Sequence, residues 1–133
     1  MRLPTTEVGL FIFLRRNHYR DLIDRASTTS RSDCFSPKSK LLIELKCRFR
    51  HYPTLLIEKK KYDWLISNAT DGNRALYVNS TPEGVWGFYL DEIDIEWETK
   101  KMPKTTAFGS NESIDKEIGF IKISDGFDLW KCL

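Results

Sequence analysis

Glu44 and Lys46 are the residues of this sequence whose types and spacing best suit a catalytic role. They stand two residues apart in a segment, Lys40–Arg48, that reads as a β-strand with a buried start. Residues two apart on a strand project from the same face, so the Glu44 carboxylate and the Lys46 ammonium would be neighbours. Leu45 between them would point into the core while its carbonyl oxygen stays near the Glu44 side.

A second carboxylate precedes this strand. Asp33 lies upstream of a turn-prone segment, Ser36–Ser39, and if Asp33 and Glu44 occupy paired strands their carboxylates converge. Two carboxylates and the Leu45 carbonyl are hard oxygen ligands of the kind that Mg²⁺ prefers, and Mn²⁺ can substitute. A lysine beside such an ion, here Lys46, can orient or help deprotonate a bound water. These groups therefore predict the hydrolysis of a phosphodiester.

The tripeptide Glu-x-Lys is weak evidence by itself because the sequence holds three copies, Glu44–Lys46, Glu58–Lys60 and Glu98–Lys100. The second copy falls on an expected helix, where residues two apart diverge in direction. The third stands at the frayed end of a strand without an apolar lead-in. Only the first combines a buried lead-in with an upstream Asp. The structural alternative is that Asp33 is a turn residue and that the first copy lines the solvated face of an edge strand.

The first element expected around this motif is a helix that begins near Glu7, with Thr6 as its cap. Its period is set by the apolar or long residues Val8, Phe11, Ile12, Tyr19, Leu22, Ile23 and Ala26. The uninterrupted run Leu10–Leu14 fits a buried strand as well, so both possibilities stay open for it.

A second helix is expected over Leu55–Ser67, with Thr54 as its cap. Its inner face would be Leu55, Tyr62, Leu65 and Ile66. The later part of the chain predicts strands, with a turn at Thr81–Gly84 and an irregular loop at Lys100–Ser113; the strands are Ala75–Asn79, Val85–Leu90, Ile93–Trp97 and Glu117–Ile123. This order predicts an α/β (α+β) fold, a mixed β-sheet flanked by helices, in one domain over residues 1–133.

The composition excludes several classes of protein. The chain has 133 residues, 41% of them hydrophobic and 30% charged, which is typical of a globular domain and excludes disorder and collagen-like repeats. The longest apolar run, Val8–Leu14, is too short for a membrane helix, so no membrane partner is expected. Three cysteines without paired spacing favour a reduced, cytoplasmic protein, in the host cytoplasm if it is phage-encoded.

Charge is divided unevenly along the chain. Residues 1–62 hold 14 Lys/Arg and 6 Asp/Glu, a net charge of +8, and residues 63–133 hold 7 Lys/Arg and 13 Asp/Glu, a net charge of −6. A basic half suits a nucleic-acid backbone, although the two halves could instead neutralise each other. The residues nearest the motif that could grip phosphates, or simply solvate a helix and a strand end, are Arg48, Arg50, His51, Lys59 and Lys60.

The pattern Asp33…Glu44-Leu45-Lys46 on a hairpin, followed by a helix with further basic residues, resembles the PD-(D/E)xK nuclease superfamily. The stretch Ser30–Ile66 is most similar to its small phage or prophage members, and the resemblance covers about residues 7–90. It implies a restriction-endonuclease-like α-β-β-β-α-β core and Mg²⁺-dependent cleavage of nucleic acid.

This resemblance also implies roles for particular residues. Asp33 and Glu44 would be metal ligands and Lys46 the water-handling lysine. Glu7 is the candidate for a further acidic ligand from the first helix. Lys61 is the candidate for a catalytic side chain from the following helix, although Glu58 competes for that position.

Two features depart from the superfamily pattern. Ser32 stands where a proline often precedes the first Asp, and no clear strand precedes Asp33.

The sequence therefore predicts a small Mg²⁺-dependent endonuclease that acts on nucleic acid, with DNA favoured over RNA. A homodimer is expected, because so small a chain offers little surface for recognising a long duplex. Two other functions stay open. One is a nucleic-acid-binding module that keeps the fold without catalysis. The other is an interaction or inhibitor protein that uses the acidic run Asp91–Glu98.

Overall fold

β3, Leu41–Cys47, lies inside the larger of the two sheets that the described residues form, and it carries the Glu-x-Lys motif. The computed structural model describes residues 2–24, 33–104 and 112–131. In this part of the chain β3 pairs with β2, Asp33–Ser36, in antiparallel orientation, and with β5, Arg74–Thr81, in parallel orientation. The larger sheet has the strand order β1-β2-β3-β5-β6-β9, and the smaller sheet has the order β4-β8-β7.

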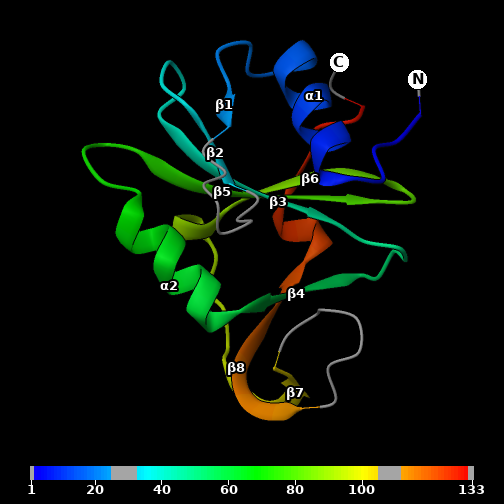
Figure 1. The fold of residues 1–133 in the computed structure, drawn as a ribbon, viewed down its shortest axis with the longest axis vertical. Coiled ribbons are helices and arrows are strands. Elements are labelled where there is room, and N and C mark those ends of the chain that lie inside the picture. The colour runs from blue at the N-terminus through cyan, green and yellow to red at the C-terminus, as the bar shows by residue number, and fades with distance from the viewer. Residues whose placement is uncertain (1, 25–32, 105–111, 132–133) are drawn as a thin grey trace.

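Figure 1 shows how the other elements surround this strand. The remaining helices and strands of the described residues are α1 (Glu7–Asn17), β1 (Ile23–Asp24), β4 (Thr54–Glu58), α2 (Lys59–Asn68), β6 (Gly84–Tyr89), β7 (Glu98–Pro103), β8 (Ser113–Lys122) and β9 (Phe127–Asp128), with short 3₁₀ turns η1 (Leu90–Glu92) and η2 (Ile123–Asp125). None of the helices in the described residues is long and apolar enough to cross a membrane.

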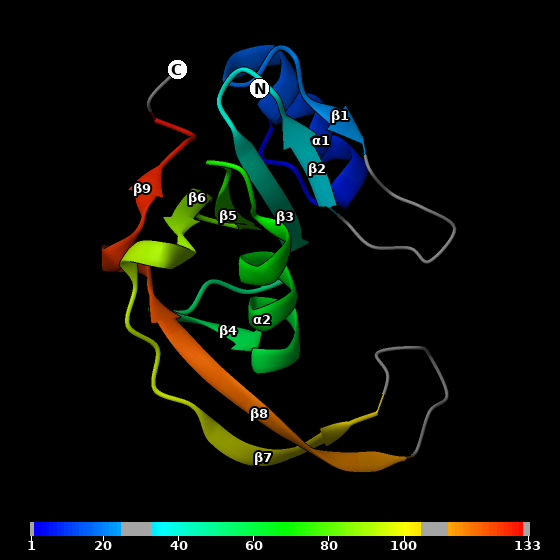
Figure 2. The same ribbon diagram turned by 90° about the vertical axis from the view of Figure 1, so that its left-hand side faces the viewer.

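Two helices cover opposite faces of the larger sheet (Figure 2). The odd-numbered residues of β3 pack against the buried side of α1, whereas Leu42 belongs to a second core that includes Leu65 of α2. A strand that is buried on both faces is apolar without alternation, which explains the Leu41-Leu42-Ile43 run. Glu44 therefore stands on the α2 face of a strand whose surroundings are apolar.

Thr6 caps α1 as predicted, because its Oγ1 accepts a hydrogen bond from the Gly9 N–H at 3.0 Å. The helix ends at Asn17 and does not continue to Ala26, so the predicted extension is wrong; Ala26 itself lies outside the described residues. The residues that set the expected helical period do not mark the buried side of the helix. Val8 and Ile12 are exposed, and the buried residues of α1 are Leu10, Phe13 and Leu14. Because this segment is apolar nearly all round, its period did not identify the buried side, and the strand alternative for it is excluded.

The helix predicted over Leu55–Ser67 is wrong in its first part. Thr54–Glu58 is strand β4, and α2 begins only at Lys59, with Glu58 rather than Thr54 at its N-cap. β4 pairs with β8, which follows it by about sixty residues in the chain. A pairing so distant leaves no local signal, and the apolar Leu55-Leu56-Ile57 run fits either structure.

The two hairpins predicted from the sequence are confirmed. β2 and β3 pair across the turn at 37–40, and β5 and β6 pair across Thr81–Gly84. The later assignments are partly wrong, since Ile93–Trp97 is irregular and the predicted loop Lys100–Ser113 contains most of β7. Ile95 and Trp97 pack closely over Gly119 of β8, where any larger side chain would clash with Ile95.

The β2–β3 turn is held by Asp21 from outside the hairpin. Asp21 accepts hydrogen bonds from the Lys38 N–H at 2.7 Å and from the Ser36 hydroxyl at 2.8 Å, and these lower the pKa of its carboxyl. Because this turn sets the register between β2 and β3, Asp21 supports the placement of Asp33 opposite Glu44.

We expect Asp21→Ala to lower the melting temperature at pH 7 and to lower it less at pH 3. A carboxyl whose pKa is lower in the folded state contributes stability above its unfolded pKa of about 3.9, and this contribution is lost as the pH falls through the folded pKa. Thermal unfolding followed by circular dichroism at both pH values measures the difference. Asp94→Ala, at an exposed position, is the control. An equal loss at both pH values would contradict the assignment to the ionised carboxylate.

Candidate active site

Asp33 and Glu44 are direct partners in the antiparallel pairing of β2 with β3. Positions that oppose each other in such a pair lie on the same face of the sheet. The strand pairing on which the predicted site depends is therefore confirmed. The side chain of Asp33 lies outside what the structure describes, so the convergence of the two carboxylates stays a prediction.

Glu44 is buried, with 6% of its surface exposed, and among the described residues it is the only charged one in that class. The Nζ of Lys61, from the first turns of α2, lies 3.3 Å from Glu44 Oε1. A carboxylate removed from water is costly unless a positive group compensates its charge, and Lys61 supplies one. A buried charge at the centre of an apolar strand lowers stability compared with an apolar residue, which is typical of functional sites.

Lys46 follows on the same face of β3, half-buried, where the strand leaves the apolar core. In the parallel pairing with β5, Glu44 is opposite Tyr77 and Lys46 is opposite Asn79. The structure thus places two lysines from different elements around this face, Lys61 in contact with Glu44 and Lys46 two residues along the strand. The catalytic roles of both lysines stay predictions.

A buried polar network borders this face, and the sequence analysis missed it. Arg48 Nε donates to Asn79 Oδ1 at 3.0 Å, and Arg48 Nη2 donates to the Tyr77 hydroxyl at 2.9 Å and to the Leu56 carbonyl. Burial raises the pKa of the Tyr77 hydroxyl, the Arg48 guanidinium lowers it, and the Glu44 carboxylate raises it. The residue that could have indicated this network from the sequence was Asn79, at the end of a run of strand formers. A side-chain amide that is buried in a strand requires a hydrogen-bond partner.

The five predicted phosphate-binding residues lie in four different surroundings. Arg48 is half-buried and its hydrogen bonds are to the protein interior, whereas Arg50 is exposed in the loop after β3. His51 Nδ1 lies 2.9 Å from Thr81 Oγ1, at the β5–β6 turn. Lys59 and Lys60 line a separate cavity of about 520 Å³. A role for each in nucleic-acid binding stays a prediction.

At the start of α2 the neighbouring charged residues have partners that separate them from Glu44. Lys59 forms an ion pair with Asp63 at 2.8 Å, and the hydrogen bond that Lys59 donates to Asp63 raises the pKa of Lys59. Glu58 binds Lys116 of β8 at 2.7 Å. Of the two residues that competed for the position beside Glu44, the structure therefore brings Lys61 there and directs Glu58 to the smaller sheet.

Glu7 approaches the end of β3 from the other side of the sheet. Burial, which is the larger cause, and the nearby Glu7 carboxylate raise the pKa of the Cys47 thiol to about 11. Cys47 packs with the α1 core, on the face opposite to Glu44. Among the described residues, no three His, Cys, Asp or Glu side chains form a group that could hold a metal ion, and the side chain of Asp33 is outside that set. A contribution of Glu7 to a metal site stays a prediction.

Comparisons with known proteins identify the fold. Neither a scan against models of protein families nor a search of curated proteins finds a match for this sequence. A search of solved structures finds Hjc from Archaeoglobus fulgidus, a Holliday junction resolvase from an archaeal hyperthermophile, with a TM-score of 0.58 and 18% sequence identity. The match covers 92% of this chain and 87% of that chain. At this identity the likeness shows the fold alone, and it confirms the predicted mixed α+β, restriction-endonuclease-like fold.

Proposed function

We propose that this protein is a metal-dependent nuclease that hydrolyses phosphodiester bonds in nucleic acid, with DNA as the favoured substrate. The observation that carries the proposal is the buried charge of Glu44, directly across the strand pair from Asp33 and two residues before Lys46. The structurally similar Archaeoglobus protein is a Holliday junction resolvase, which supports nucleic acid as the substrate.

The groups present suit Mg²⁺ or Mn²⁺. Two carboxylates at opposed positions and the Leu45 carbonyl are hard oxygen donors, the set that these ions prefer. A divalent cation would also compensate the Glu44 carboxylate, which burial removes from water. The residues that would hold the ion are Asp33, Glu44 and Leu45. When bound, the ion supplies Lewis-acid polarisation of the phosphate and makes water a stronger nucleophile near neutral pH.

The lysines of the site have different tasks. Lys61, at 3.3 Å from Glu44 Oε1, is a positioning residue that fixes the orientation of this carboxylate. Lys46 orients the attacking water and stabilises the negative charge that develops on the phosphate. In the reaction the water oxygen forms a bond to phosphorus, and the bond from phosphorus to the leaving sugar oxygen breaks. The attacking water gives up a proton to solvent, and the leaving sugar oxygen takes a proton from solvent.

The direct test is metal removal. We expect the full-length protein to cleave labelled DNA in Mg²⁺ or Mn²⁺, to lose this activity in EDTA, and to regain it when Mg²⁺ is restored. Gel analysis of a four-way junction, a linear duplex, a single strand and an RNA of the same sequence would show which substrate is cleaved. Cleavage that continues in EDTA contradicts the proposal. Salt-sensitive binding without cleavage in any divalent cation would instead identify a non-catalytic binding module.

A homodimer is part of the same proposal, because one chain of this size presents a small surface to a duplex. Sedimentation equilibrium at micromolar concentration tests it, and a monomer mass with and without DNA would refute it.

A further inference from the structure

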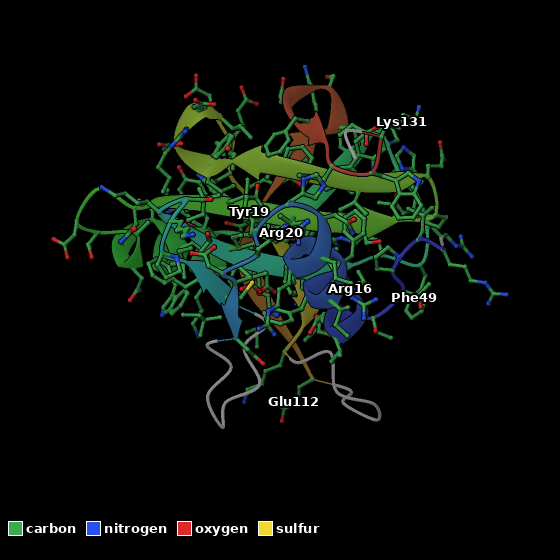
Figure 3. All side chains as sticks on the ribbon, turned by 90° about the horizontal axis from the view of Figure 1, so that it is seen from above. Arg16, Tyr19, Arg20, Phe49, Glu112 and Lys131 are labelled. Carbon is green, nitrogen blue, oxygen red and sulfur yellow. The ribbon has the colours of Figure 1, made fainter. Side chains whose placement is uncertain are left out.

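A groove of about 810 Å³ runs between the loop that follows β3 and the outer face of the smaller sheet. Three aromatic side chains on it are unusually exposed, Phe49 at 98%, Tyr52 at 53% and Phe120 at 43% of their surface. Figure 3 shows Phe49 toward the edge of the molecule. Aromatic rings left in water at this level cost free energy, and a cluster of them marks a binding surface.

The charges on this groove all have one sign. Its described lining includes Arg48, Arg50 and Lys100 and contains no carboxylate. Arg48 is engaged with the interior, but Arg50 and Lys100 are exposed. Cations beside exposed aromatic rings match a ligand that has both a negatively charged backbone and flat rings.

We propose that this groove binds unpaired nucleotides of a nucleic acid. Bases stack on Phe49 and Tyr52, and Arg50 and Lys100 contact the phosphates. The bases of an intact duplex are already stacked on each other, so a protruding ring such as Phe49 finds a partner only where a base has left the duplex. The groove therefore favours loops, ends, flaps and branch points over continuous duplex.

A second copy of this chain fits the groove less well. A twofold interface brings the same surface of both subunits together, so the lining of one groove, whose charged residues are all cations, would meet the same lining in the other subunit. Like charges that meet in an interface oppose association. The phosphates of a nucleic acid would instead form ion pairs with the same cations.

The position of the groove connects it to the candidate active site, a point that rests on the proposed function. Phe49 follows Glu44 by five residues, a separation of at most about 18 Å along an extended chain. This corresponds to about five nucleotide steps of 3.4 Å along one strand. Arg48 links the two regions, because it binds Leu56 of the groove and Tyr77, the strand partner of Glu44. Cleavage is then expected within a few nucleotides of the unpaired segment.

Binding is measured by fluorescence anisotropy in EDTA, so that no cleavage is needed. The probes are a labelled oligothymidylate of about 12 nucleotides, within the site sizes known for single-strand binders, and a blunt duplex of similar length. Phe49→Ala is expected to weaken oligothymidylate binding roughly 5- to 150-fold and to change duplex binding much less. Phe49→Leu, which keeps an apolar side chain without a ring, should weaken oligothymidylate binding as well. Phe49→Trp, which keeps an aromatic ring, should bind oligothymidylate like the wild type.

Ile12→Ala is the matched control, because Ile12 is 44% exposed on α1 and is not part of the groove. Single-strand binding by Phe49→Ala or Phe49→Leu equal to that of the wild type overturns the proposal. So does a result in which Phe49→Ala changes a dimer into a monomer while oligothymidylate binding is unchanged, since the groove then holds a second copy. If Glu44→Gln loses cleavage but still binds oligothymidylate through Phe49, both the active site and the groove are supported. If the wild type binds oligothymidylate through Phe49 but cleaves no substrate, the groove proposal is supported and the nuclease proposal is refuted.

Discussion

Glu44→Gln is expected to reduce metal-dependent cleavage roughly 10²- to 10⁴-fold and to leave the melting temperature unchanged or higher. The substitution keeps the shape of the side chain and removes the buried charge. Lys61, which loses its partner, is 29% exposed and reaches water, so no buried charge is left uncompensated. A residue that the fold needs would behave in the opposite way, with lost stability and unchanged chemistry.

Lys46→Ala is the companion variant. Because Lys46 acts on the attacking water and on charge that develops in the transition state, kcat should fall with little change in KM. Parallel loss of kcat and binding would indicate that Lys46 only attracts the substrate.

The matched controls come from β7, which contains Glu98 of the third Glu-x-Lys copy and the nearby Lys101. Glu98→Gln and Lys101→Ala alter exposed residues of β7 in a region of similar charge, away from β3. Both should cleave like the wild type. If the Glu44 and Lys46 variants keep full activity, or if the β7 variants lose as much, the assignment of the active site is wrong.

The part of the site that could be predicted is the part that local sequence encodes. A turn sequence between two short strands sets the Asp33–Glu44 register, and alternation along β3 sets the shared face of Glu44 and Lys46. Lys61 was expected beside the site from the resemblance alone. Its contact with Glu44 required α2 to begin at Lys59, four residues later than the sequence indicated.

The errors have a common physical origin in long-range contacts. β4 exists because it pairs with β8, and the buried face of α1 is chosen by the sheet beneath it. Neither partner is visible in the local period of an apolar segment. The same reason explains why the sequence did not reveal the buried hydrogen bonds of Arg48, which its position near the motif suggested for phosphate binding. Its partners Asn79 and Tyr77 are about thirty residues away in the chain.

Arg48→Met is expected to destabilise the fold by roughly 2–4 kcal/mol, because it removes three hydrogen bonds and leaves buried acceptors without a donor. Arg48→Lys should rescue little of this loss, since one ammonium cannot reproduce the planar fork that reaches Asn79, Tyr77 and the Leu56 carbonyl. Urea unfolding measures the change. Arg50→Met, two residues further on and exposed, should stay within about 0.5 kcal/mol of the wild type.

The two arginines should separate again in nucleic-acid binding. A side chain that contacts phosphate contributes to the dependence of affinity on salt, so Arg50→Met should reduce the slope of log K against log salt by about one. Arg48→Met, assayed where the variant remains folded, should leave the slope unchanged, because the guanidinium is held by the protein and not by the ligand. A reduced slope in Arg48→Met together with wild-type stability would reverse the two roles. Arg48 would then be the phosphate contact that its position after β3 first suggested, and the link between Leu56 and Tyr77 would be dispensable for the fold.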